Sequence, residues 1–237
     1  NAGMQLQDAV VLVTGGSSGI GYAIAQTLKE AGAKVIVTGR SRERLVAAEQ
    51  ALGVYAIHAD VSIEEDVIRT VQEVIQEFGH LDVLINNAGF GVFHNLVDQD
   101  RASFEAVLAT NVTGAMLMGR EAARHFIERK KGHIINIAST AALRGAPRGT
   151  AYYASKFALR GMTECWRAEL RKHNIRVMLV NPSEVATGFY PTAGLPQNVN
   201  DSKLRGDEIA HAIKSILEMD DRGFTTEMTI FATNPVD

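Results

Sequence analysis

The sequence predicts an α/β fold in which helices cover both faces of a doubly wound parallel sheet. Short apolar runs, such as residues 10–13 and 34–38, alternate along the chain with stretches of helical periodicity. Strands that are apolar on both faces are typical of parallel sheets buried between two helix layers. Because crossovers between parallel strands are right-handed, the three-layer α/β/α arrangement is the expected topology.

The expected elements alternate along the chain, with apolar runs as strands and amphipathic stretches as helices. The expected strands span residues 10–13, 34–38, 54–59, 82–86, 134–138, 176–180 and 227–231. The expected helices span residues 20–31, 42–52, 63–78, 101–129, 152–173 and 207–218. Gly32 and Gly79 follow two of these helices, as is common at helix ends. Residues 182–206 contain three prolines and three glycines and are too long for a simple connection, which indicates a lid or binding loop.

Composition points to one domain, expected over residues 4–237, because 237 residues of which 46% are hydrophobic can bury a sizeable core. Residues 1–3, before Met4, have the character of a cloning remnant. A net charge of −3 argues against a nucleic-acid partner, and no apolar run is long enough to cross a membrane. The single cysteine, Cys165, favours a reducing, cytoplasmic setting. The histidines show no metal-ligand spacing, so no metal site is expected.

A glycine-rich turn, residues 14–21, follows the first expected strand and opens the first helix. Glycines permit a sharp turn and the close approach of a pyrophosphate, and the amides at a helix start favour an anion. The residues expected to contact a dinucleotide here are Gly15, Ser17, Ser18, Gly19, Ile20 and Gly21. The spacing Gly-x-x-x-Gly-x-Gly differs from the common Gly-x-Gly-x-x-Gly, and a plain tight turn is the alternative.

Two segments after later strands support a dinucleotide site. Asp60 and Val61 follow the third expected strand, where the carboxylate could meet the adenine amine. Asn87, Ala88 and Gly89 follow the fourth, where small residues permit close approach of the cofactor. Taken singly, each segment is more often a helix cap or a turn.

Arg40 bears on the choice between NADP and NAD. An NAD site usually has a carboxylate after the second strand to bind the ribose 2′-hydroxyl, whereas an arginine there accommodates the 2′-phosphate of NADP. The second expected strand is followed by Gly39-Arg40-Ser41, with no acid. We therefore expect NADP, with NAD the less favoured cofactor; a solvated arginine at a helix start is the alternative.

Ser139, Tyr152 and Lys156 form the expected proton-transfer group. Ser139 closes an apolar strand, and Tyr152 and Lys156, four residues apart, share one face of a helix. A free phenol has a pKa of about 10, and a nearby ammonium and a positive nicotinamide ring would lower the pKa of Tyr152. Ser139 can hold a substrate oxygen beside the phenol. Together with the glycine turn, this predicts hydride transfer to or from a carbonyl carbon.

On these motifs, together with Asn111 and Asn181-Pro182, the whole chain resembles the short-chain dehydrogenase/reductase family, in particular its 3-oxoacyl-[acyl-carrier-protein] reductase-like members. The resemblance implies a Rossmann fold, with Tyr152 as general acid/base and Ser139 as the partner of the substrate oxygen. Lys156 would bind the nicotinamide ribose and lower the pKa of the phenol. Asn111 would hold a proton-relaying water. Pro182 and Thr187 would lie on the cofactor side, with Thr187 at the nicotinamide carboxamide.

The leading functional hypothesis is an NADP(H)-dependent oxidoreductase that reduces a ketone to a secondary alcohol, with 3-oxoacyl thioesters as the favoured substrates. An alcohol, sugar or hydroxy-acid dehydrogenase is the alternative within enzymes. A nucleotide-sensing binding protein without turnover is the alternative of another class. The resemblance further implies a homodimer or homotetramer, with an acyl carrier protein as a partner to consider. The chain departs from the family at Ser183, where a glycine is usual, and lacks a Gly-Gly tail.

Overall fold

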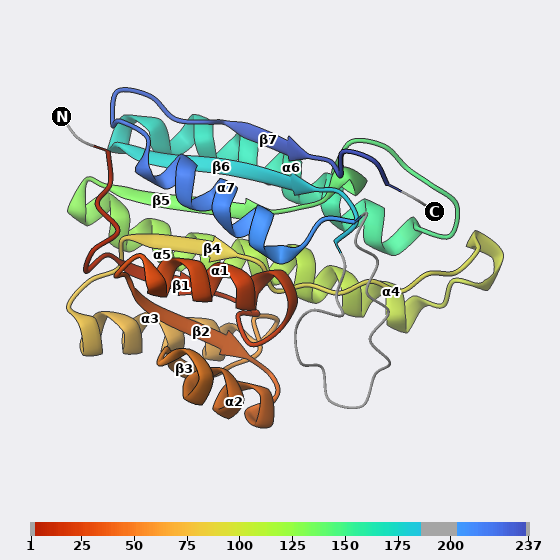
Figure 1. Ribbon diagram of the computed structural model, residues 1–237. Coiled ribbons are helices and arrows are strands. Elements are labelled where there is room, and N and C mark those ends of the chain that lie inside the picture. Colours follow the sequence, from red (N-terminus) through yellow and green to blue (C-terminus); the bar gives the residue numbers. More distant parts are fainter. Residues whose placement is uncertain (1–2, 186–202, 236–237) are drawn as a thin grey trace.

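The computed structural model describes residues 3–185 and 203–235, and in these residues it shows one seven-stranded parallel sheet (Figure 1). The strands are β1 (Val10–Val13), β2 (Lys34–Gly39), β3 (Tyr55–His58), β4 (Val83–Asn86), β5 (Gly132–Ile137), β6 (Ile175–Pro182) and β7 (Glu227–Ile230). Their order is β3-β2-β1-β4-β5-β6-β7, and every neighbouring pair is parallel. The chain winds outward in both directions from β1 and β4. A ligand crevice is expected beyond the carboxyl ends of these two strands.

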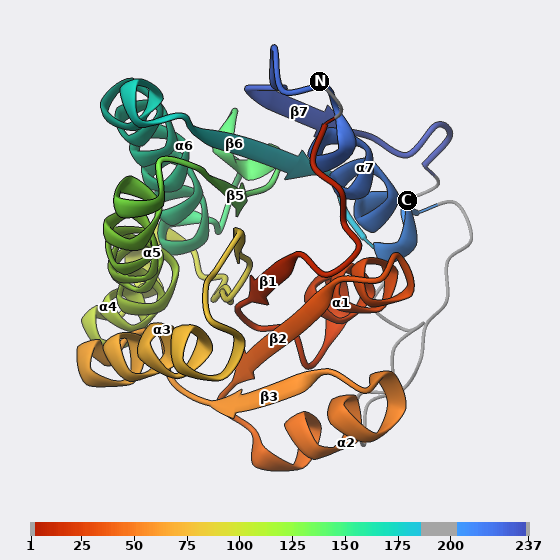
Figure 2. The same cartoon turned by 90° about the vertical axis from the view of Figure 1, so that its left-hand side faces the viewer.

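Helices cover both faces of the sheet (Figure 2). The α-helices are α1 (Gly19–Glu30), α2 (Arg42–Leu52), α3 (Glu64–Phe78), α4 (Arg101–Leu108), α5 (Ala115–Arg129), α6 (Thr150–Leu170) and α7 (Gly206–Glu218). Short 3₁₀ turns span Leu96–Asp98, Thr140–Ala142 and Arg171–His173. One face carries α1 beside α7, and the other carries α3, α5 and α6. The doubly wound, three-layer α/β/α prediction is therefore confirmed.

Alternating side chains of each central strand supply two separate cores. In β1, Val11 and Val13 pack into the cluster that contains Ile24 of α1, whereas Leu12 packs into the cluster that contains Phe126 of α5. All four residues of β1 are at most 1% exposed. Successive side chains of a strand point to opposite faces, so a strand buried on both faces must be apolar throughout. The uninterrupted valine and leucine run in β1 follows from this requirement.

The expected elements are present, with one informative difference. The stretch predicted as one helix over residues 101–129 is divided by a π-helical turn, Ala109–Gly114, between α4 and α5. Elsewhere the bounds shift by a few residues; the predicted helix 152–173, for example, is α6 followed by a 3₁₀ turn at Arg171–His173. Helical periodicity cannot reveal a single widened turn, because the apolar pattern continues on both sides of it. Such π turns occur frequently at functional sites.

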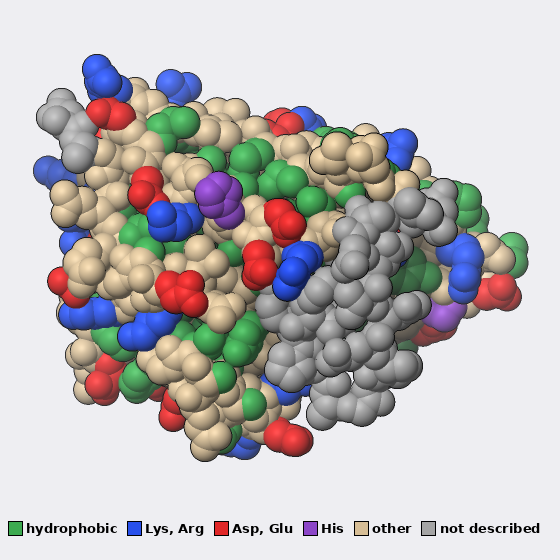
Figure 3. All heavy atoms as spheres, viewed as in Figure 1, with side chains coloured by type: hydrophobic (Ala, Val, Ile, Leu, Met, Phe, Trp, Pro, Cys, Tyr) green, Lys and Arg blue, Asp and Glu red, His purple; other side chains and the backbone are tan. Residues whose placement is uncertain are grey.

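The face of the molecule in Figure 3 carries acidic and basic side chains interspersed with apolar ones. Among the described residues, no helix combines the length and the apolar character that crossing a membrane requires.

His133, at the start of β5, should make stability depend on pH. Its side chain is 8% exposed, and its Nδ1 has no hydrogen-bond partner. Burial, reinforced by the charge of Arg176 and partly offset by Asp221 and Asp82, lowers the pKa of His133 to about 4. In the unfolded chain a histidine has a pKa of about 6.5, so folding favours the neutral ring. Stability should therefore be lost as pH falls from about 6.5 towards 4.

We expect the unfolding free energy to drop by about 2–3 kcal/mol from this group between pH 7 and pH 4.5, as measured by urea denaturation. His133→Asn removes the titrating group. Between pH 7 and pH 4.5 its unfolding free energy should therefore fall by about 2–3 kcal/mol less than that of the wild type. If wild type and variant lose the same stability, His133 does not titrate as described.

Candidate active site

The glycine turn between β1 and α1 is fastened to the segment that follows β4. The hydroxyl oxygen of Thr14 accepts hydrogen bonds from the backbone amides of Asn87 and Ala88, each at 3.0 Å. In return, the side-chain amide of Asn87 donates to the carbonyl oxygens of Thr14 and Gly15, each at 3.2 Å. These reciprocal bonds fix the turn at the topological switch point of the sheet.

Glycine is required in this turn for two physical reasons. Gly15 and Gly19 have φ values of 64° and 57°, in the left-handed region that glycine adopts most readily. Gly21 meets a different limit, since a Cβ there would overlap the carbonyl oxygen of Gly15 and the side chain of Asn87. No side chain caps the start of α1, which leaves its first amides available to an anion.

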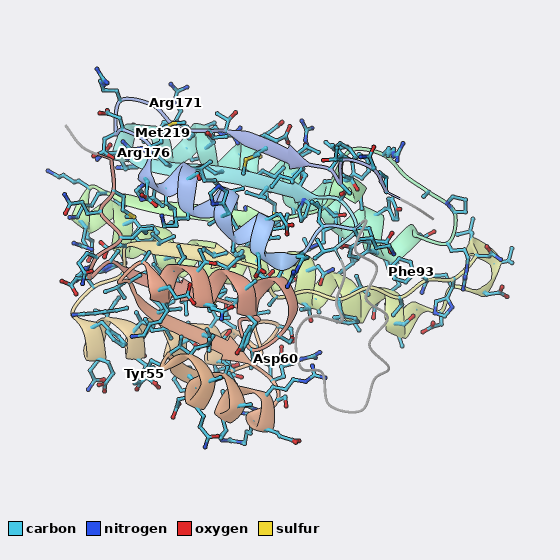
Figure 4. All side chains as sticks on the ribbon, viewed as in Figure 1. Tyr55, Asp60, Phe93, Arg171, Arg176 and Met219 are labelled. Carbon is cyan, nitrogen blue, oxygen red and sulfur yellow. The ribbon has the colours of Figure 1, made fainter. Side chains whose placement is uncertain are left out.

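Two clefts open at the carboxyl ends of the strands, one on each side of the turn. The smaller, of about 250 Å³, includes Gly15, Ser17 and Ser18. The larger, of about 470 Å³, includes Gly19 and Ile20. In Figure 4, Asp60 and Phe93, which line the smaller and the larger cleft respectively, both lie toward the carboxyl ends of the strands, whereas Arg176 lies toward the opposite end.

The smaller cleft brings together residues from the ends of β2, β3 and β4. Of the residues expected to bind a cofactor, it also contains Arg40, Asp60, Val61, Ala88 and Gly89. The Arg40 guanidinium lies 3.9 Å from the carboxylate of Asp60, and its side chain is 62% exposed, so this pair is weak. One oxygen of Asp60 accepts hydrogen bonds from the amide and hydroxyl of Ser62, which orients the carboxylate.

The larger cleft contains both hydroxyl groups of the expected proton-transfer group. Ser139 follows β5, and its Oγ accepts a hydrogen bond of 3.0 Å from the amide of Ala141. Tyr152 lies in the first turn of α6, with its ring 5.6 Å from that of Phe93 between centroids. Pro182, at the end of β6, also lines this cleft. A substrate oxygen could therefore approach both hydroxyls from one side.

The environment of Tyr152 favours the neutral phenol. Burial raises the pKa of Tyr152, and a hydrogen bond with the Ser139 side chain lowers it to a smaller extent. This direction is opposite to the one expected from the sequence. Desolvation of the phenol outweighs the favourable contacts, because burial disfavours the charged form of any acid.

Lys156 lies behind the ring of Tyr152 rather than in the larger cleft. Its Nζ is 5.6 Å from the ring centroid and donates a hydrogen bond of 3.3 Å to the carbonyl oxygen of Ile137. Burial lowers the pKa of Lys156 to about 8. Lys156 therefore loses its charge readily at alkaline pH, because burial removes the water that would stabilise the ammonium.

Asn111 connects helix α6, which carries Tyr152 and Lys156, to the segment after β4. It lies in the π turn and is 2% exposed. Its side-chain oxygen accepts from the amide of Phe90 at 3.0 Å, and its side-chain nitrogen donates to the carbonyl oxygen of Phe90 at 2.8 Å and to Ser155 Oγ at 3.0 Å. Asn111 and Lys156 together line a cavity of about 10 Å³, which is at the lower limit for one water molecule.

The structure separates the expected residues into those that line a cleft and those that support it. Gly21, within the glycine turn, and Asn87, which donates hydrogen bonds to it, line neither cleft and shape the turn. Thr187 lies outside the described residues. Within residues 3–185 and 203–235, no His, Cys, Asp or Glu side chains gather in a group of three or more that could hold a metal ion.

Sequence reasoning missed two supporting residues. Ser155 Oγ donates to the carbonyl oxygen of Tyr152 at 2.6 Å while it accepts from Asn111, so it links the two. Thr14 fastens the glycine turn through its hydroxyl. Ser155 lies within the Tyr-x-x-x-Lys motif and Thr14 begins the glycine turn, so their places in these motifs were a signal. The hydrogen bonds that they make with distant segments cannot be seen in a sequence.

Comparison with known proteins decides the family. The sequence profile of the short-chain dehydrogenases matches residues 9–196. The chain belongs to the short-chain dehydrogenase family.

Similar proteins agree with this assignment over nearly the full chain. (+)-Borneol dehydrogenase 2 of Salvia officinalis is 39% identical over 200 residues, which cover 82% of this chain and 70% of that protein. A metagenomic short-chain oxidoreductase in complex with NADP has a TM-score of 0.85 at 33% identity, covering 98% of this chain and 100% of the other. The 3-ketoacyl-(acyl-carrier-protein) reductase of Brucella melitensis, complexed with NADH, has a TM-score of 0.87 at 28% identity, covering 96% and 98%.

This short-chain dehydrogenase is therefore an NAD(P)-dependent oxidoreductase that acts on CH–OH groups or the corresponding carbonyls. Its residues fit a dinucleotide. The uncapped start of α1 can receive a pyrophosphate, and the space that Gly21 leaves next to Gly15 lets the turn adopt its shape. The smaller cleft contains residues expected to contact the adenosine, and the larger cleft contains those expected to hold the substrate.

Ser183 stands where a glycine is usual in this family, and the structure accommodates it. Its φ is not positive, so no glycine is needed at this point of the backbone. Its amide donates to the carbonyl oxygen of Ile230 at 2.8 Å, and its Oγ accepts from the amide of Ala232 at 3.3 Å. The serine thus fastens the end of β6 to the segment after β7.

Gly21→Ala should damage the glycine turn. The added methyl group must push against the Gly15 carbonyl and Asn87, and overpacking of this kind costs about 1–3 kcal/mol. We expect a lower melting temperature together with at least tenfold weaker NADPH binding by calorimetric titration. Gly223→Ala, where a Cβ meets nothing within 4 Å, is the matched control and should be neutral or stabilising. Equal behaviour of the two variants would contradict the close-approach argument.

Proposed function

We propose that this enzyme is an NADP(H)-dependent reductase that converts a ketone to a secondary alcohol. The observation that carries the proposal is the convergence of Ser139 and Tyr152 on one cleft, with Lys156 behind the tyrosine ring. A dinucleotide held at the glycine turn would supply the hydride. The chain supplies the proton and the groups that hold the carbonyl.

Tyr152 serves as the proton donor. In the direction of reduction, the phenol must be neutral to give its proton to the carbonyl oxygen as the adjacent carbon receives the hydride. Burial keeps the pKa of Tyr152 raised, so the phenol is protonated near neutrality. Ser139 donates a hydrogen bond to the same oxygen and orients it towards Tyr152.

Lys156 and Asn111 support this proton transfer without lining the larger cleft. The ammonium of Lys156 stabilises the phenolate left after proton transfer and binds a ribose hydroxyl of the cofactor. The small cavity between Lys156 and Asn111 has room for one water molecule, which would link Lys156 to further proton donors. This arrangement would return the proton to Tyr152 after each turnover.

The NADP preference rests on Arg40. Its guanidinium lies on the rim of the smaller cleft, and no acidic residue stands in its place at the end of β2. A guanidinium binds a phosphate through paired hydrogen bonds, whereas the ribose 2′-hydroxyl of NAD is usually met by a carboxylate. The similar structures bind either cofactor, one with NADP and one with NADH, so the proposal depends on this side chain.

A 3-oxoacyl thioester is the favoured substrate, supported by the similarity to a 3-ketoacyl reductase. An acyl carrier protein would then deliver it. Oxidation of a secondary alcohol is the alternative, supported by the similarity to a borneol dehydrogenase. A screen of NADPH oxidation over 3-oxoacyl thioesters, diketones, quinones and sugars separates these classes. Absence of turnover in both directions would favour a nucleotide-sensing protein instead.

We further infer a homodimer or homotetramer formed through α6 and the long helical segment 101–129, which comprises α4, the π turn and α5, as the family resemblance implies. Light scattering at micromolar concentration tests this, and a monomer would contradict it.

Tyr152→Phe should abolish turnover and leave the binding of NADPH nearly unchanged. The substitution removes the transferable proton but keeps the ring and its packing. Proton transfer by a positioned group contributes about 10²–10⁴-fold to the rate. The measurement combines single-turnover kinetics with cofactor titration. If more than a tenth of the wild-type rate survives while chemistry limits turnover, Tyr152 is not the proton donor.

Lys156 should impose a pH dependence on cofactor binding. With its pKa lowered to about 8, the lysine loses its charge as pH rises through that value. NADPH affinity and kcat/KM should therefore fall above about pH 8 in the wild type. Lys156→Arg stays charged, so its profile should lose this step, whereas Lys156→Met should bind and react poorly throughout. An identical pH profile in wild type and Lys156→Arg would refute the role of the ammonium.

Arg40→Asp should reverse the cofactor choice. The new carboxylate repels the 2′-phosphate but can accept a hydrogen bond from an unphosphorylated ribose. Charge-assisted contacts contribute about 1.5–3 kcal/mol, so NADP affinity should fall by about ten- to a hundredfold. NAD affinity should be unchanged or better. Titration of both cofactors against both proteins is the test, and a wild type that already prefers NAD would overturn the NADP assignment.

A further inference from the structure

Phe90 places an aromatic ring beside the guanidinium expected to recognise NADP. It follows Gly89 after β4, and the Cζ atom of Arg40 lies 5.8 Å from the centroid of its ring. Both side chains line the smaller cleft. This separation is within the range of about 6 Å over which a cation is attracted to an aromatic face.

We propose that Phe90 is a positioning residue for cofactor choice: its ring holds the guanidinium of Arg40 at the place where a ribose 2′-phosphate would bind. The inference rests on the proposed NADP preference and extends it from Arg40 to a second residue. An arginine that is 62% exposed samples many rotamers, and ordering such a side chain on binding costs conformational entropy. A ring that restricts Arg40 beforehand reduces this loss for NADP and has no such effect on NAD.

An aromatic partner suits this task better than an acidic one. The carboxylate of Asp60 is the nearest charged partner of Arg40, at 3.9 Å, and a carboxylate that bound Arg40 tightly would occupy the N–H groups that a phosphate needs. Contact with a ring face leaves the N–H groups at the edge of the guanidinium free. The cleft thus provides Arg40 with a support that does not compete with the ligand.

The backbone of Phe90 is held by hydrogen bonds from a buried side chain. The side chain of Asn111 bonds both the amide and the carbonyl oxygen of Phe90, at 3.0 and 2.8 Å. Asn111 is buried, and its third hydrogen bond goes to Ser155 in the helix that carries Tyr152. The backbone that carries the ring beside Arg40 is therefore fixed by the same side chain that joins the π turn to α6.

The test measures dissociation constants of NADP and NAD for Phe90→Leu, Phe90→Tyr and the wild type. Loss of a partly exposed cation–π contact should weaken NADP binding by about two- to fivefold in Phe90→Leu and leave NAD binding unchanged. Phe90→Tyr keeps an aromatic face and should retain the wild-type ratio. Phe231→Leu, which removes an exposed ring after β7 outside both clefts, is the matched control.

A second arm repeats Phe90→Leu in an Arg40→Leu background, where it should have no further effect on NADP binding. The inference is overturned if Phe90→Leu weakens both cofactors equally, if it changes neither, or if its effect persists without Arg40. Unchanged NAD binding also shows that the variant is folded, and Phe90→Tyr provides the comparison if Phe90→Leu is unstable. A wild type without NADP preference would overturn the proposed cofactor as well, which distinguishes the two failures.

Discussion

The hydrogen bonds of Asn111 are the constraint on which the rest of the site depends. A buried amide side chain must satisfy its donors and its acceptor, and Asn111 does so by joining the π turn, the segment after β4 and helix α6. The same segment after β4 holds the glycine turn through Thr14 and Asn87. One side chain thus connects the segment that holds the glycine turn to the helix that carries Tyr152 and Lys156.

Burial then assigns the titrating groups their roles. Desolvation raises the pKa of Tyr152 and lowers that of Lys156. Each shift favours a neutral group, so the phenol stays protonated near neutrality, as the proposed proton donor requires, while the lysine lies close to its titration point. Such opposed shifts in neighbouring groups are characteristic of sites that move protons. They arise because Tyr152 and Lys156 lie on the inner side of α6, against the carboxyl end of β5.

Much of this arrangement can be predicted from the sequence because the sheet imposes it. Apolar runs give the strands, right-handed crossovers give their order, and the carboxyl ends of β1 and β4 place the glycine turn beside Asn87. The π turn at Asn111 was not foreseeable in this way, since a single widened turn leaves the helical pattern intact. Burial raises the pKa of Tyr152, and the sequence does not reveal this effect because burial depends on packing; the lowering of this pKa by a nicotinamide ring stays a prediction. The contact of Phe90 with Arg40 likewise joins residues 50 positions apart.

Amide hydrogen exchange tests the central role of Asn111 most directly. The amide of Phe90 is bonded to the side chain of Asn111, so Asn111→Leu, of similar volume, should accelerate exchange around Phe90 by about tenfold or more. Exchange in β2 and α2, which make no contact with Asn111 through these bonds, should stay unchanged. Wild-type protection around Phe90 in Asn111→Leu would show that Asn111 does not hold this segment, and the account of how the site is assembled would then be wrong.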